Sequence, residues 1–161
     1  MSAEVTRILE FAKRLAREAG QIQRESYEGE FEVRTKSAVI DLVTDVDQAC
    51  ERLIIDAIQT ERRGDAILAE EGGGTDDPDA EWRWVIDPLD GTANYAHGYP
   101  RFCVSIGIER RGVATLGVVY DPLLDELFSA VRGGGARLND RPLQVSAEAR
   151  LDHGEVAAVL P

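Results

Sequence analysis

Hydrophobic residues recur at helical spacing over the first part of the chain. From Glu4 to about Tyr27 they fall three or four residues apart, which predicts an amphipathic helix with one apolar face. Gly20 interrupts this pattern, because a glycine inside a helix costs about 1 kcal/mol relative to alanine. We therefore expect a helix here, with its second half less strongly specified than its first.

A second helical pattern covers residues 43–64. Thr44 is its expected N-cap, and Asp47 follows three residues later, as in a capping box. A carboxylate at that position also stabilises the end of a helix by about 0.3 to 1 kcal/mol without any other role. Residues 31–36 alternate between apolar and polar side chains, and this predicts a short strand between the two helices.

After the second helix the hydrophobic pattern changes to alternation or to short continuous runs, several bounded by turn signals. Both features predict strands. Helices followed by a run of strands favour an α+β fold, in which a largely antiparallel sheet packs against the two helices. The six predicted strands fall within residues 66–71, 82–88, 102–110, 114–122, 126–132 and 135–146.

Composition narrows the class of protein. The 161 residues, 43% of them hydrophobic, fit one domain with its own core. The net charge of −12 disfavours nucleic-acid binding, which needs clustered Lys and Arg, whereas it leaves room for cations. No apolar run approaches the roughly 20 residues that cross a bilayer, and no targeting segment is evident, so we expect a cytoplasmic protein. The two cysteines, Cys50 and Cys103, are expected to be free thiols.

Acidic residues gather where two predicted strands end. Glu70 and Glu71 follow the first of these strands, and Asp87 and Asp90 follow the next. If the strands are neighbours, the carboxylates meet at one sheet edge and repel each other. Residues 86–97 contain no Lys or Arg, so a hard cation such as Mg²⁺ is the candidate partner. A simpler interpretation, that Asp-Pro and Asp-Gly merely form a turn and cap a helix, fits this local pattern equally well.

The next two residues favour the metal interpretation. If a helix begins at Gly91 and Thr92, their backbone N–H groups form an anion site, and the glycine lets a phosphate approach the chain. The Thr92 hydroxyl is able to hold a water molecule. Together with a bound cation, these groups predict metal-assisted hydrolysis of a phosphate ester.

The stretch "WVIDPLDGTANYAHGYP" (84–100) resembles the signature of the inositol monophosphatase family of Mg²⁺-dependent, lithium-sensitive phosphatases. Further blocks resemble that family in the same order: "DLVTDVDQACE" (41–51), "LAEEGG" (68–73), "VSIGIER" (104–110) and "GARLNDRPLQVS" (135–146). The resemblance implies a phosphomonoesterase that hydrolyses inositol 1-phosphate or a related polyol or sugar phosphate, and an enzyme that pairs as a homodimer. It also implies that residues 1–161 form the N-terminal metal- and phosphate-binding domain of the αβαβα sugar-phosphatase fold.

The resemblance assigns roles to individual residues. One group would bind two or three Mg²⁺ ions in the complete enzyme, a second would orient and activate the attacking water, and a third would bind the phosphate. The implied metal ligands are Glu70, Asp87, the Leu89 carbonyl and Asp90, the implied catalytic residues are Asp47 and Thr92 together with Glu70, and the implied phosphate ligands are the amides of Gly91 and Thr92.

Four other residues have weaker claims. Glu71 is expected to support a metal ligand rather than to bind the ion directly. Lys36 matches a family position beside the site. We expect His97 to pack or to face the substrate entrance instead of binding metal, and His153 to lie on the surface.

The resemblance has one gap. The family carries a C-terminal portion with a Trp-Asp motif, whose aspartate ligates the second metal, and no such dipeptide occurs in these 161 residues. The chain is thus expected to be a fragment of a longer enzyme, one piece of a split protein, or a short non-catalytic relative. In each case we expect little or no turnover from the chain alone. Phosphatases of the same superfamily for 3′-phosphoadenosine 5′-phosphate, fructose 1,6-bisphosphate or histidinol phosphate remain alternatives.

Overall fold

The fold was analysed in a computed structural model, which describes residues 2–27, 33–35, 42–70, 72, 74–75, 77–147 and 150. The side chains of residues 33–35 and 42–44 are outside this description. Three residues with expected roles, Lys36, Glu71 and His153, also lie outside the described residues. No helix in the described part of the chain combines the length and hydrophobicity needed to cross a bilayer.

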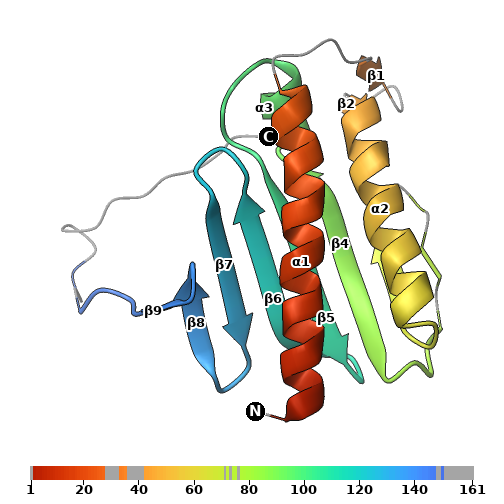
Figure 1. The fold of residues 1–161 in the computed structure, drawn as a ribbon, viewed down its shortest axis with the longest axis vertical. Helices are drawn as coiled ribbons and strands as arrows, with labels where there is room; N and C mark the ends of the chain where they lie inside the picture. Colours follow the sequence, from red (N-terminus) through yellow and green to blue (C-terminus); the bar gives the residue numbers. More distant parts are fainter. Residues whose placement is uncertain are drawn as a thin grey trace.

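The helices and most of the strands follow in the order that the hydrophobic pattern predicts (Figure 1). Residues 42–44, where the second helical pattern was expected to begin, instead form a strand that the sequence did not predict. The first helix begins after Ser2, whose side chain accepts a hydrogen bond from the Val5 amide at 3.2 Å and so caps the helix. The elements are α1 (Ala3–Ser26), β1 (Val33–Thr35), β2 (Leu42–Thr44), α2 (Asp45–Glu61), β3 (Ala66–Ala69), β4 (Trp82–Asp90), α3 (Thr92–Ala96), β5 (Cys103–Arg110), β6 (Val113–Asp121), β7 (Glu126–Val131), β8 (Gly135–Leu138) and β9 (Arg141–Leu143).

Strands β3 to β9 form one seven-stranded sheet in sequence order, and β1 pairs with β2 in a separate antiparallel pair. Only the β3–β4 pair of the large sheet is parallel. The predicted α+β class, with a largely antiparallel sheet against two helices, is confirmed. The prediction of six strands is wrong at the end of the sheet, where residues 135–146 form the hairpin β8–β9. Asn139 and Asp140 both adopt positive φ, and the chain reverses there.

Helices α1 and α2 lie side by side across one face of the sheet (Figure 1). Alternate residues of the central strands point into this layer, as the period of two requires. Phe11 of α1 meets Trp84 of β4 edge to face, with ring centroids 5.6 Å apart. The Trp84 indole N–H donates to Asp65 at 2.8 Å, so the largest buried side chain also satisfies its polar group.

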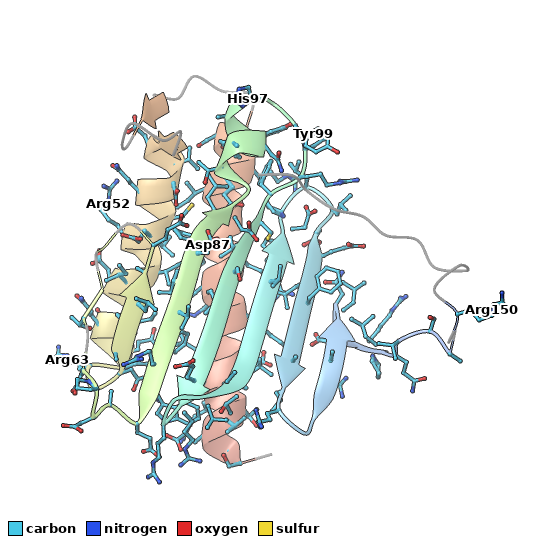
Figure 2. All side chains as sticks on the ribbon, turned by 180° about the vertical axis from the view of Figure 1, so that it is seen from behind. Arg52, Arg63, Asp87, His97, Tyr99 and Arg150 are labelled. Atoms are coloured by element: carbon cyan, nitrogen blue, oxygen red, sulfur yellow. The ribbon has the colours of Figure 1, made fainter. Side chains whose placement is uncertain are left out.

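The opposite face of the sheet is left uncovered by the described helices (Figure 2). One row of paired residues crosses all seven strands on this face. At the β3 edge of the sheet this row contains two large exposed side chains, Leu68 and Val85. At the β9 edge it contains a third, Leu143. The residues between these edges are small, and a hollow of about 290 Å³ lies over them. In sequence order along this stretch they are Gly107, Gly117, Ala130 and Ala136.

Gly20 has a structural reason to interrupt the pattern of α1. A Cβ atom at this position would lie 2.5 Å from Cδ1 of Tyr120, whose ring packs directly against the helix backbone. The glycine therefore lets α1 approach β6 closely, and this contact offsets its low helix propensity.

We expect Gly20→Ala to destabilise the protein by about 1–3 kcal/mol, because the added methyl group overpacks against Tyr120. At an open helix position the same change would instead stabilise by about 1 kcal/mol. Urea denaturation of the purified chain measures the difference. Gly64→Ala is the control, since its Cβ would meet no heavy atom within 4 Å. A Gly20→Ala protein more stable than wild type would contradict the proposed contact.

Candidate metal and phosphate site

The candidate site lies at the edge of the sheet where β3 and β4 end. The parallel pairing of β3 with β4 brings Glu70, just after β3, to the same edge as Asp87. Convergence of the acidic strand ends, predicted from the sequence, is confirmed for these two residues, because Ala69 pairs with Ile86 and the charge of Glu70 raises the pKa of Asp87. Figure 2 shows Asp87 near this end of β4, on the face away from α1.

Strand β4 does not end at Pro88, as the sequence pattern suggested. Its pairing with β5 shifts register between Asp87 and Asp90 and resumes where Asp90 meets Cys103. Proline has no N–H to donate to the ladder, so a bulge forms around it while the strand continues. The two aspartates therefore flank an irregularity inside β4 instead of following its end.

The ionised form of Asp87 is disfavoured by its surroundings. The pKa of its carboxyl is raised from 3.8 to about 7, mainly by burial and then by the negative charges of Glu70, Asp90 and Asp47. Its Oδ1 atom is buried and accepts no hydrogen bond in the described structure. A carboxylate in this position is stabilised by a cation that contacts its free oxygen.

Asp47 and Asp90, whose charges raise the pKa of Asp87, come from different elements. Asp47 comes from the first turn of α2 and is 2% exposed. Asp90 is exposed, and the Cys103 thiol donates to its Oδ2 at 3.7 Å. Burial, followed by the charge of Asp90, raises the pKa of Cys103 to about 12, so this thiol stays protonated. Both cysteines are free, as expected; Cys50 is buried and Cys103 partly buried.

The predicted helix start at Gly91 and Thr92 is confirmed by α3. Gly91 is its N-cap with φ 92° and ψ 34°, and a Cβ there would lie 2.8 Å from the Arg101 carbonyl oxygen. Both facts require glycine. The Thr92 hydroxyl donates to the Leu89 carbonyl at 2.8 Å, so two residues with expected site roles contact each other.

Aromatic residues hold α3 against α1. The rings of Tyr27, Tyr95 and Phe102 form a cluster with centroid distances of 4.7–5.6 Å. The Tyr95 hydroxyl donates to the backbone carbonyl of Gln23 at 2.8 Å. The Gln23 side chain in turn donates to the Pro88 carbonyl at 2.7 Å. The last turn of α1 thus contacts both the bulge of β4 and α3.

Sequence reasoning missed Gln23 and Cys103 as neighbours of the site. Cys103 gave no signal, because only the register of β5 places it beside Asp90. Gln23 did give one: it is a polar residue on the otherwise apolar stripe of α1. His97 is exposed, and its Nδ1 lies 2.7 Å from the Ala93 carbonyl oxygen at the end of α3. This contact is compatible with the expectation that His97 does not bind metal.

The donor atoms fit Mg²⁺ in type. Carboxylates and a backbone carbonyl are hard oxygen ligands, and the free Oδ1 of Asp87 provides one unshared donor. Among the described residues, no group of three or more His, Cys, Asp or Glu side chains is arranged to hold a metal ion by itself. Mg²⁺ needs no such cage, because it usually keeps several waters and takes one or two carboxylates. The described residues therefore offer oxygen donors of the type that Mg²⁺ takes, without forming a complete site among themselves.

Comparison with known proteins agrees with this chemistry. The model of the inositol monophosphatase family matches residues 4–160. The chain belongs to the inositol monophosphatase family. It matches only the N-terminal ~55% of its homologues.

Individual relatives have two kinds of name. The Nus factor SuhB of Pasteurella multocida is 44% identical over 139 residues, which are 86% of this chain and 52% of that protein. An inositol-1-monophosphatase of Synechocystis is 47% identical over 121 residues, covering 75% of this chain and 42% of that protein. The crystal structure of the extragenic suppressor protein SuhB from Bartonella henselae superposes with a TM-score of 0.84 at 36% identity, over 89% of this chain and 56% of that one. The chain thus spans about half the length of the relatives it matches.

Asp87→Asn is expected to stabilise the metal-free chain above neutral pH. Because the folded pKa is raised from 3.8 to about 7, wild type loses stability as pH rises through this interval, and the loss is complete above it. The amide does not ionise. We expect the variant to exceed wild type by about 1–2 kcal/mol at pH 8 with chelator, allowing for solvent screening of a partly exposed group. Near pH 4 the two should be equal. Urea denaturation at both pH values measures this.

At pH 8 with Mg²⁺, wild type should be more stable than Asp87→Asn. The ion binds the folded wild type and so stabilises it, whereas the variant has lost one of the ligands of the ion. Asp125→Asn serves as the matched control at an exposed aspartate whose side chain only accepts from Tyr120. Equal stabilisation of wild type and Asp87→Asn by Mg²⁺ would exclude Asp87 as a ligand.

Proposed function

We propose that the chain is the N-terminal metal- and phosphate-binding domain of a Mg²⁺-dependent phosphomonoesterase that acts on inositol 1-phosphate or a related polyol or sugar phosphate. The observation that carries the proposal is Asp87, whose free buried oxygen and raised pKa call for a cation. Membership of the inositol monophosphatase family supports the reaction class.

In this proposal Mg²⁺ is held by Asp87 and by the other oxygen donors of the same edge: Glu70, the Leu89 carbonyl and Asp90. The ion supplies positive charge to the phosphoryl oxygens and acidifies water. The amides of Gly91 and Thr92 orient the phosphate at the start of α3 in this proposal.

Thr92 and Asp47 orient the attacking water in the same proposal. The Thr92 hydroxyl directs its proton to the Leu89 carbonyl, so its oxygen is left to accept a proton of the water. Asp47, buried at the start of α2, provides a carboxylate on the helix side of Asp87. Positioning and charge neutralisation are the main contributions that a protein makes to phosphoryl transfer.

A second candidate function is regulatory binding without catalysis. It is favoured by the relatives named Nus factor SuhB, of which one is 44% identical to this chain. The two candidates differ over Asp87, because a binding surface does not need a metal ligand that a phosphatase requires. Fold similarity does not distinguish the two candidate functions, since relatives with both kinds of name share this fold.

The test joins the chain to the C-terminal portion of the Synechocystis relative and measures phosphate release with Mg²⁺. The panel contains inositol 1-phosphate, fructose 1,6-bisphosphate, 3′-phosphoadenosine 5′-phosphate and histidinol phosphate. We expect turnover from the joined protein, and little or none from the 161-residue chain, which contains no Trp-Asp motif. Asp87→Asn should lower kcat by ~100-fold or more, whereas Asp125→Asn should leave it unchanged.

Robust hydrolysis by the 161-residue chain alone would show that its site is complete. Turnover that survives both chelation and Asp87→Asn would contradict the metal-dependent mechanism. A joined protein that folds, binds Mg²⁺ and hydrolyses no substrate of the panel would favour the regulatory candidate.

A further inference from the structure

Gln23 is a fully buried glutamine on the apolar face of α1, and its exposed fraction is 0%. The stripe that it continues is otherwise built mainly from aliphatic side chains such as Leu15 and Ala19. Its Nε2 donates to the Pro88 carbonyl at 2.7 Å, across 65 positions of sequence. The glutamine therefore tethers α1 to the bulge of β4.

This hydrogen bond holds a segment of β4 that is not regularly paired with β5. The pairing of β4 with β5 lapses between Asp87 and Asp90, and Pro88 lies inside that gap. A backbone segment that lacks ladder pairing is held by its other hydrogen bonds. The bond from Gln23 is one such bond, and it fixes the carbonyl between the two aspartates.

Stability alone does not explain a glutamine at this position. Its Oε1 atom is buried and has no hydrogen-bond partner in the described structure. A half-satisfied buried amide costs stability relative to an apolar side chain of the same shape. A buried polar residue with such a cost is a candidate for a role in the geometry of a site.

We propose that Gln23 is a positioning residue of the metal site, which holds the Pro88 carbonyl so that Asp87 and Asp90 keep the spacing that the cation requires. This inference rests on the proposed function, because it assumes that these carboxylates bind a metal. The contact of Tyr95 with the Gln23 backbone extends the same support to α3.

The test compares Gln23→Met with Gln21→Met. Methionine keeps the length of the side chain and removes the N–H donor. Gln21 lies two residues away on the same helix, is exposed and pairs with Glu25, so it is a matched control. Tb³⁺ is the probe, with luminescence excited through Trp84, which lies about 10 Å before Asp87 along β4. Urea denaturation and amide hydrogen exchange of residues 86–92 complete the set.

We expect Gln23→Met to bind Tb³⁺ about tenfold more weakly than wild type, to exchange the amides of residues 86–92 faster, and to keep its urea midpoint within about 0.5 M. Gln21→Met should match wild type in all three measurements. Unchanged Tb³⁺ affinity in Gln23→Met would overturn the inference. So would a variant that unfolds or loses much of its stability, because Gln23 would then be a structural residue.

The outcomes separate this inference from the proposed function. If wild type binds Tb³⁺ and Gln23→Met binds it equally well, the metal site stands and the positioning role fails. If wild type binds no Tb³⁺, the proposed metal site fails, and the role of Gln23 fails with it.

Discussion

Pro88 imposes the constraint on which the site depends. It lies in a strand that is hydrogen-bonded on both sides, and it has no N–H to donate. The β4–β5 ladder therefore slips between Asp87 and Asp90, and the chain turns at Gly91 into α3. Without this bulge, β4 would continue as regular strand and its carboxylates would simply alternate between the two faces of the sheet.

The bulge places negative charge where the protein does little to compensate it. Asp87 is partly buried, and the carboxylates around it come from α2, from the end of β3 and from its own strand. Such an arrangement of carboxylates weakens the fold unless a cation joins it. The uncharged contacts nearby, which include the cluster of Tyr27, Tyr95 and Phe102, stabilise the same region.

Family membership and function stand on different observations. The match over residues 4–160 and the superposition with solved relatives establish the family and its fold. The relatives nevertheless carry names of both phosphatases and Nus factors. The proposed function rests on the oxygen donors around Asp87 and on the amides at the start of α3, because chemistry belongs to a site and not to an architecture.

The sequence by itself determined the elements and the types of ligand. Periodicity located α1, α2 and most of the strands, though not β2, and the glycine after Asp90 marked the start of α3, because these signals act over a few residues. Only the tertiary structure decided the hairpin β8–β9, the bulge that carries β4 past Pro88, and the partners Cys103 for Asp90 and Gln23 for Pro88. Those contacts depend on strand register and on helix packing between residues far apart in the chain. A one-residue shift of either would change every partner without altering the local pattern.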